Sequence, residues 1–435
     1  MSNAIDAYPV VVIGAGPVGL AAAAHLAGRG LPFTVLEAGA GPAAAVRAWG
    51  HVRLFSPWRF DVDAAARRLL TDAGWVEPDP DRLPTGAELA DDYLRPLADL
   101  PALKAHIRYG ARVAAVSRLG LDRVRTAGRA DAPFVARLAT GDDVLARAVV
   151  DASGTWTTPN VLGGSGLPAH GEPESSVEPA LPDVLGTDRD RFAGVRTLVV
   201  GAGHSAANTL LSLVELARQA PGTSVVWAIR SAGSARAYGG GAADALPARG
   251  ALGTRLRGHV DAGDIELVAG FSTGSLRPTG DGRVAVSDGV RTITVDRVVG
   301  ATGFRPDHSV TAELRLDLDP ILGSTRALAP LIDPNRHSCG TVPPHGVDEL
   351  AHPEPGFYAV GAKSYGRAPT FLMATGYEQA RSVVAALAGD WAAARDVQLD
   401  LPETGVCNSD PIAGSPRSPL TLVAVDGAGG GACCG

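Results

Sequence analysis

The sequence is poor in cysteine, lysine and aromatic residues. Only four cysteines occur among 435 residues, which excludes a scaffold held together by disulfide bonds. Lysine stands only at Lys104 and Lys363, so nearly all of the 39 basic residues are arginine, a skew that we attribute to coding bias. Aromatic residues make up 5% of the chain, but 46% hydrophobic residues are enough for a buried core.

The chain also lacks an excess of positive charge and any long apolar run. Its net charge is −7, so neither nucleic acid nor an anionic membrane surface is expected as a partner. No segment approaches the roughly 20 apolar residues that cross a bilayer, and the N-terminus shows no secretion-signal pattern. We therefore expect a cytoplasmic protein of about two to four domains.

Two segments have the pattern of a nucleotide-binding βαβ unit. In the first, an apolar strand at 9–13 leads into a glycine turn at 14–19, an alanine-rich helix and a strand at 32–36. The second has a strand at 198–200, a turn at 201–206, a helix at 208–219 and a strand at 224–229. This repetition predicts an α/β protein with two Rossmann-like domains.

The first glycine turn has the composition of a dinucleotide-binding loop. Its glycines permit a tight turn, the approach of a pyrophosphate, and close packing of helix on strand, and the helix N-terminus offers N–H groups to phosphate. A carboxylate at the end of the next strand can accept hydrogen bonds from ribose hydroxyls. The alternative is a tight turn without a ligand. The predicted ligand-binding residues are Gly14, Gly16, Pro17, Gly19 and Glu37.

The second glycine turn differs from the first at the end of its second strand. Arg230 stands where an acidic residue would contact a ribose, and a positive charge there favours the 2′-phosphate of NADPH over NADH. Gly201, Gly203 and Ser205 are predicted to hold the pyrophosphate. His204 is expected to pack near it, with catalysis as the less favoured alternative.

Each unit closes with an apolar strand that runs into a small-residue turn, ending at Gly154 and Gly303. With Gly201-Ala-Gly-His-Ser-Ala206 and Ala301-Thr-Gly-Phe-Arg-Pro-Asp307, the chain over about residues 8–390 resembles flavin monooxygenases and the related thioredoxin reductase-like flavoproteins. This resemblance implies FAD on the first domain, NADPH on the second, and the second inserted into the first. It implies an FAD domain at 1–165 and 305–395, an NADPH domain at 166–304 and a flexible tail at 396–435.

The resemblance also implies contacts with the flavin. The stretch around Trp49 and Ser56 is similar to the monooxygenase segment beside the isoalloxazine, so these two are tentative catalytic residues; the alternative is an aromatic loop that packs under the domain. Val113, Gly154 and Gly361 are further expected FAD contacts, and Gly303 is an expected contact on the NADPH side. In the family an acidic residue often follows the glycine equivalent to Gly361, but Ala362 and Lys363 follow it here. A helix beginning near 375 is expected to direct its N-terminus at the flavin.

The four cysteines separate the functional alternatives. A flavin disulfide reductase needs a C-x-x-C or C-x-x-x-x-C pair, and neither spacing occurs. A monooxygenase needs no protein nucleophile, although the F-x-G-x-x-x-H motif of typical flavin monooxygenases is missing. Thiolates bind soft ions such as As(III) or Hg(II), and the pattern is similar to flavoproteins encoded with actinobacterial arsenic-resistance genes. The tentative metalloid ligands are Cys339, Cys407, Cys433 and Cys434; the alternative is an incidental tail.

The sequence therefore predicts an FAD-containing, NADPH-dependent monooxygenase that uses O₂ to oxygenate a small soft nucleophile, with a trivalent arsenical as one candidate. Two alternatives remain open. One is a reductase that passes electrons through Cys433 and Cys434 to a thiophilic ion or small disulfide, and the other is a non-catalytic metalloid binder. The sequence leaves the oligomeric state open.

Overall fold

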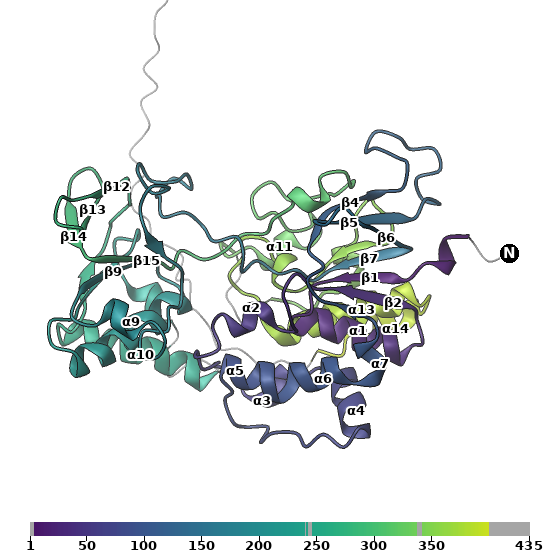
Figure 1. Ribbon diagram of the computed structural model, residues 1–435, viewed down its shortest axis with the longest axis horizontal. Coiled ribbons are helices and arrows are strands. Elements are labelled where there is room, and N and C mark those ends of the chain that lie inside the picture. The colour runs from purple at the N-terminus through teal and green to yellow at the C-terminus, as the bar shows by residue number, and fades with distance from the viewer. Residues whose placement is uncertain (1–3, 240, 242–245, 337–341, 400–435) are drawn as a thin grey trace, which may run out of the picture.

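The computed structural model describes residues 4–239, 241, 246–336 and 342–399, and in it two α/β domains lie side by side (Figure 1). Among these residues the first domain contains a five-stranded sheet of order β16-β7-β1-β2-β3, in which all neighbours are parallel. Its strands are β1 (Val10–Ile13), β2 (Phe33–Leu36), β3 (Ile107–Arg108), β7 (Ala148–Asp151) and β16 (Phe357–Ala359).

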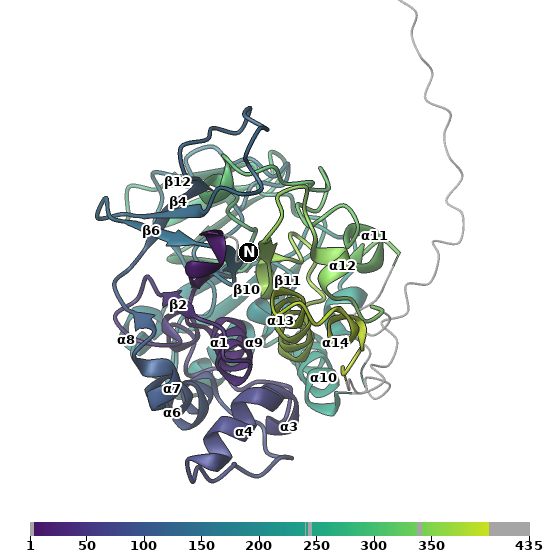
Figure 2. The ribbon, with the colours of Figure 1, turned by 90° about the vertical axis from the view of Figure 1, so that its right-hand side faces the viewer.

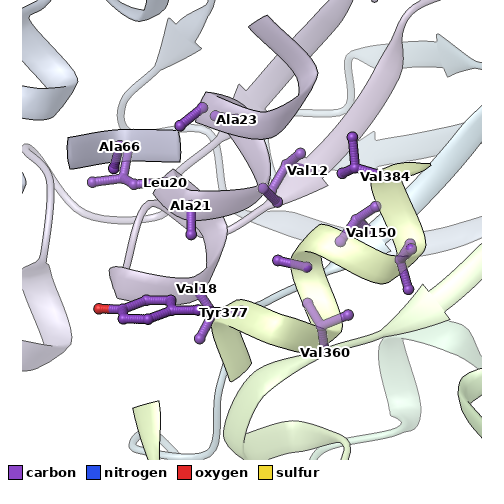
Figure 3. Packing of buried hydrophobic residues seen from close by; sticks show 14 of the residues in the cluster. Val12, Val18, Leu20, Ala21, Ala23, Ala66, Val150, Val360, Tyr377 and Val384 are labelled. Atoms are coloured by element: carbon purple, nitrogen blue, oxygen red, sulfur yellow. The ribbon is translucent and has the colours of Figure 1, made fainter. Parts of the chain in front are cut away.

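Two helices from opposite ends of the chain cover one face of this sheet. They are α1 (Pro17–Gly28) and α13 (Met373–Leu387). Val12 and Val150 of the sheet belong to the same buried cluster as Val18 and Ala21 of α1 and Tyr377 of α13 (Figure 3). Four consecutive alanines in α1 are fully buried, and their small side chains let neighbouring elements approach closely. The apolar core predicted from the first βαβ unit is therefore present.

A further layer of short helices lies on the far side of α1 and α13 (Figures 1 and 2). The Asp63 carboxylate begins the longest of them by accepting hydrogen bonds from the N–H groups of Ala65 and Ala66, and it also pairs with His25 of α1 at 3.1 Å. This layer holds the segment 49–61 against the first domain. Its helices are α2 (Ala44–Arg47), α3 (Trp58–Asp61), α4 (Ala64–Asp72), α5 (Gly86–Glu88), α6 (Arg95–Asp99) and α7 (Pro101–Lys104).

The second domain has its own five-stranded sheet among the described residues, of order β11-β10-β9-β15-β8. Its main helices are α9 (His204–Gln219), which follows the second glycine turn, and α10 (Pro247–Asp261), which the sequence pattern had not indicated. The predicted class of two Rossmann-like domains is confirmed. The strands are β8 (Val177–Glu178), β9 (Arg196–Val200), β10 (Ser224–Ala228), β11 (Glu266–Val268) and β15 (Arg297–Gly300).

Each domain also carries a three-stranded antiparallel sheet. The two segments that join the domains run next to each other: Asn160 N–H donates to Gly303 O at 2.9 Å, and Arg305 N–H donates to Thr158 O at 3.0 Å. The exact domain boundaries stay a prediction. The antiparallel strands are β4 (Val113–Arg118), β5 (Phe134–Leu138) and β6 (Asp143–Ala146) in the first domain, and β12 (Ser275–Pro278), β13 (Val284–Ser287) and β14 (Thr292–Val295) in the second.

A buried cluster of charges joins β4 to the chain just before β16. The Glu354 carboxylate accepts hydrogen bonds from Arg118 Nε at 2.8 Å and from Arg129 Nη2 at 2.7 Å. It also accepts the N–H of Arg315 at 3.0 Å. The Arg118 guanidinium lies 3.6 Å from the centre of the Phe134 ring. Because these side chains are almost fully buried, each charge depends on its partners for solvation.

Shorter helices complete the described part of the chain. In the described part of the stretch 305–355, which has little sequence periodicity, the helices are short turns of three or four residues. In the described ranges no helix is long and apolar enough to span a membrane. The remaining α-helices are α8 (Arg189–Phe192), α11 (Ala329–Ile332), α12 (Val347–Leu350) and α14 (Trp391–Arg395).

Candidate cofactor and substrate site

The three glycines of the first turn have distinct surroundings. A Cβ atom on Gly14, whose φ is +98°, would lie 2.8 Å from Ala152 O, and one on Gly19 would lie 2.0 Å from Gly14 O. A Cβ on Gly16 would meet no atom of the described chain within 4 Å. The fold itself therefore requires Gly14 and Gly19, whereas Gly16 leaves open space at the N-terminus of α1, where Pro17 is the first helical residue.

The Glu37 carboxylate organises this turn. Its Oε2 accepts the N–H of Ala15 and its Oε1 accepts the N–H of Gly39, both at 2.6 Å. The side chain is buried at the carboxyl end of β2. Each carboxylate oxygen can accept a second hydrogen bond, so Glu37 can hold the turn and accept a further donor. Its contact with ribose hydroxyls stays a prediction.

An unexpected ion pair lies beside this turn. Lys363, which stands where an acidic residue is common, places Nζ 2.6 Å from Asp151 Oδ2 at the end of β7 and 3.2 Å from Ser153 Oγ. Burial alone would raise the pKa of Asp151, but the Lys363 charge and hydrogen bonds from Lys363 and Ser153 lower it. The pair fixes the turn that leads to Gly154, where φ is +71° and a Cβ would meet no described atom within 4 Å.

Gly361 connects the last strand of the first sheet to α13. Its N–H donates to Gln379 Oε1 at 2.8 Å, and Gln379 is fully buried. A Cβ on Gly361 would lie 3.2 Å from Val18 Cγ2, so this turn packs directly on α1. The start of α13 at Met373, two residues before the predicted start, is thereby held near the first glycine turn.

Trp49 and Ser56 lie on the segment that runs beneath the first domain. The Trp49 ring packs on the backbone of α5: a Cβ on Gly86 would lie 2.7 Å from Trp49 Cε3. Ser56 Oγ donates to Asp61 Oδ1 at 2.7 Å. Asp61, which the sequence pattern did not single out, is almost fully buried, and burial raises its pKa to about 7 although the Ser56 hydrogen bond opposes the rise. The flavin roles of Trp49 and Ser56 stay predictions.

The second glycine turn repeats the geometry of the first. A Cβ on Gly201, with φ +136°, would lie 2.0 Å from Ala301 O, whereas one on Gly203 would meet no described atom within 4 Å. Trp227 Nε1 donates to Gly201 O at 2.7 Å and fixes the turn from β10. Ser205 lies in the first turn of α9, at whose N-terminus the N–H groups point outward. The open side of Gly203 has the shape expected for a pyrophosphate contact.

Three side chains of the second domain have contacts that the sequence did not predict. His204 lies against Phe55 of the first domain, with ring centres 5.1 Å apart, and the Arg249 guanidinium lies 5.9 Å from the same ring. The role of His204 near the pyrophosphate stays a prediction. Arg230 follows β10 and donates from Nη1 to Gly164 O at 3.2 Å while remaining exposed.

The other predicted contacts are not gathered at one place. Val113 is buried in an apolar cluster, although Ala111, two residues earlier, donates its N–H to Glu37 O at 2.8 Å. Gly303 lies in one of the two segments that join the domains. A Cβ added to it would lie 3.4 Å from Asn160 Nδ2. Within the described ranges, no cluster of three or more His, Cys, Asp or Glu side chains is arranged to hold a metal. Cys339, Cys407, Cys433 and Cys434 all lie outside the described residues.

The residues at the two turns fit two dinucleotides. The first turn combines two glycines at which a Cβ would clash with backbone, Gly14 and Gly19, with one that faces open space, Gly16. The second turn combines one of each kind, Gly201 and Gly203, and has Ala206 at its third position. The sequence model of the pyridine nucleotide-disulphide oxidoreductase family matches residues 11–322. The chain belongs to this family. The oxidoreductase uses FAD and NADPH as its cofactors.

Comparison with individual proteins agrees with this membership. The oxidoreductase is 31% identical over 208 residues to an indole-3-pyruvate monooxygenase of rice, a match that covers 47% of this chain and 44% of the rice protein. Its fold is similar to a bacillithiol disulfide reductase from Bacillus cereus (TM-score 0.65, 17% identity, 88% and 99% of the two chains). It is also similar to a flavin-containing monooxygenase from Stenotrophomonas maltophilia (TM-score 0.56, 22% identity, 87% and 98%).

Arg230→Asp tests the predicted preference for NADPH. The substitution replaces a charge that can pair with the 2′-phosphate by one that repels it, so we expect NADPH to bind about ten- to a hundredfold more weakly, with NADH little changed. Dissociation constants for both nucleotides, measured by titration of the FAD-loaded protein, give the ratio. Arg218→Asp, at an exposed arginine near the end of α9, is the control. An unchanged NADPH/NADH ratio in Arg230→Asp would remove Arg230 from the site.

Proposed function

We propose that the oxidoreductase is a flavin monooxygenase that oxidises NADPH and transfers one oxygen atom from O₂ to a small nucleophile. Bound FAD would supply the electron transfer and the activation of oxygen. We assign its pyrophosphate to the first glycine turn, its ribose to Glu37, and its reactive end to the region between Ser56 and the start of α13. The second glycine turn and Arg230 would hold NADPH.

The lining of a small cavity carries this proposal. Seven residues line it, from the segment 56–61, from the start of α13 and from the second domain. Among the described residues, they offer a hydroxyl, a carboxyl, a thioether and hydrocarbon groups but no thiol, while the four cysteines all lie outside the described residues. A disulfide reductase requires a redox-active thiol at the flavin, whereas a monooxygenase requires only that the reactive end of the flavin be sheltered from water. The lining residues are Ser56, Phe60, Asp61, Leu246, Leu372, Met373 and Ala374.

The described residues have three tasks in this function. Glu37 and the first glycine turn hold the cofactor in register with the sheet. The Lys363–Asp151 pair neutralises a buried charge next to that turn without the acidic residue that is common in the family. Phe55, packed between His204 and Arg249, helps to keep the two domains together so that water is excluded between them.

A trivalent arsenical remains our candidate for the nucleophile on sequence grounds. The support is the set of four cysteines, which together could bind a soft ion, and the resemblance to flavoproteins encoded with arsenic-resistance genes. Replacing Cys433 and Cys434 by serine separates the cases. Loss of arsenite protection with NADPH oxidation intact would favour sequestration by the two thiols, whereas loss of anaerobic NADPH oxidation would favour the reductase alternative.

Product analysis tests the function directly. Protein loaded with FAD is supplied with NADPH, ¹⁸O₂ and a panel of sulfides, amines and trivalent arsenicals, and oxygen uptake is followed with mass spectrometry of the products. We expect one panel member to give a product with one labelled oxygen atom. Oxidation of NADPH that is never linked to substrate oxygenation would contradict the monooxygenase, and substrate-dependent turnover without O₂ would support a reductase.

A further inference from the structure

The Asp61 carboxyl group is buried with one of its two oxygens unpaired among the described residues. Asp61 is 1% exposed at the end of α3, and its Oδ1 accepts the hydrogen bond from Ser56. Its main-chain oxygen accepts a hydrogen bond from Tyr377 at 2.8 Å. Its Oδ2 has no partner among the described residues. Since a buried polar atom without a partner costs free energy, this oxygen calls for a ligand.

The space beside Asp61 is a cavity of about 20 Å³. That volume holds one group of the size of a water molecule, and a primary ammonium group is of similar size. Apart from Ser56, whose hydroxyl is already engaged with Asp61, the side chains around it are apolar. Asp61 is therefore the only charged side chain that lines this cavity in the described part of the chain.

A second cavity, of about 580 Å³, adjoins the first. The two share Phe60 and Ala374 in their linings. The larger cavity lies among α1, α4 and α13, and exposed residues such as Arg59 and Arg68 also line it, so it reaches the surface. Phe60 and Ala374 therefore stand between the small cavity at Asp61 and the larger one that reaches the surface.

We propose that Asp61 binds the ammonium end of a primary alkylamine, with the alkyl chain running past Phe60 and Ala374 into the larger cavity. A carboxylate attracts a cation and repels an anion, and the apolar walls suit an unbranched hydrocarbon chain. The role of this amine as a substrate rests on the proposed monooxygenase function, whereas its binding does not.

The protonation of Asp61 suits such a ligand. Burial raises the pKa of Asp61 to about 7, which makes it a stronger proton acceptor toward an ammonium group than an exposed carboxylate is. An N–H bond of the ammonium breaks, an O–H bond forms at Oδ2, and the neutral amine keeps the electron pair that attack on oxygen requires.

The titratable groups around Asp61 are either uncharged near neutral pH or already paired, so Asp61 is the group that exchanges the proton. Burial raises the pKa of Tyr93 and of Tyr377 far above neutrality, so both phenols stay uncharged. Asp63 is committed to His25 and to the first N–H groups of α4. On the exposed side of α3, Arg59 pairs with Asp81.

Binding of n-butylamine and of n-butanol to the FAD-loaded protein, without NADPH, tests this site by calorimetry. We expect the amine to bind about tenfold or more tightly than the alcohol at about pH 8, because a charge-assisted hydrogen bond is stronger than a neutral one. Its affinity should fall between about pH 8 and about pH 6 as Asp61 takes up a proton, while that of the alcohol stays constant. Asp61→Asn should abolish the preference, and Asp81→Asn, at an exposed carboxylate, should retain it.

The wild-type pH profile needs no variant, so the test holds even if Asp61→Asn fails to fold. Equal binding of amine and alcohol, a flat pH profile, or a preference that survives in Asp61→Asn would overturn the site and leave a water molecule as the occupant of the cavity. Amine binding with the expected profile but no amine oxygenation would retain the site and contradict only its substrate role. Oxygenation of arsenite, a neutral acid, without amine binding would contradict the amine site and retain the monooxygenase function.

Discussion

Replacing Glu354 by alanine is expected to lower the free energy of unfolding by about 3 to 5 kcal/mol, because it leaves two buried guanidinium groups without their carboxylate. Arg118 and Arg129 are 1% and 5% exposed and both donate to Glu354. Urea denaturation followed by circular dichroism measures the change. A loss no greater than that of Asp143→Ala, which breaks an exposed pair with Arg137, would contradict the buried network.

The same carboxylate makes stability depend on pH in a defined direction. Burial alone would raise the pKa of Glu354, but hydrogen bonds from Arg129, from the Arg315 N–H and from Arg118 lower it below that of an unfolded chain. Its contribution to stability is therefore complete above the unfolded value of about 4.3 and is lost as pH falls through the folded value. The acid-induced decline should accordingly be shallower in Glu354→Ala than in the wild type.

The two kinds of glycine in the first turn should respond differently to substitution. Gly16→Val is expected to leave the melting temperature of the FAD-free protein nearly unchanged, because its φ of −79° suits any residue and its Cβ meets no described atom within 4 Å. It should weaken FAD binding by about a hundredfold, the loss expected when one or two charge-assisted hydrogen bonds to phosphate are prevented.

Gly19→Ala is the contrasting variant. Its Cβ would lie 2.0 Å from Gly14 O, so α1 must move away from the strand, at a cost of about 1 to 3 kcal/mol in stability even without FAD. Thermal melting with and without FAD, together with fluorescence titration of the flavin, separates the two effects. Gly28→Ala, at the open end of α1, is the control. Normal FAD affinity in Gly16→Val would place the cofactor elsewhere.

The sequence predicts those parts of the fold that local chemistry determines. Both βαβ units are visible because buried parallel strands are continuous apolar runs and because glycines mark each turn. Helix α10 was not predicted, since Gly250, Gly253 and Gly258 lower its intrinsic helix propensity. It is tertiary packing that accounts for it: a Cβ on Gly253 would lie 1.7 Å from Tyr238 O, so only glycine allows this contact.

Some residues of the candidate site could likewise be predicted from the sequence and others could not. Glu37 could be predicted because it follows the glycine turn at a regular position, whereas Asp61 could not, because neither its burial nor its neighbours are encoded near it in the chain. Tyr377 and Met373, which lie close to Asp61, come from the other end of the sequence. Lys363 was visible as a departure from the family pattern, but its partner Asp151 became apparent only in the structure.

Because one domain is inserted into the other, the two domains complete their sheets at different times during translation. Strands β8 to β15 of the second sheet all lie between 177 and 300, so that domain has its whole sheet once this stretch has emerged. The first sheet is complete only after β16 has been synthesised, and its cover only after α13. Glu354 is synthesised equally late, so its bonds to Arg118 and Arg129 also form late. Until then one edge of β7 lacks its partner strand and the apolar face of α1 lacks the cover that α13 provides, so the N-terminal half exposes surface that favours aggregation.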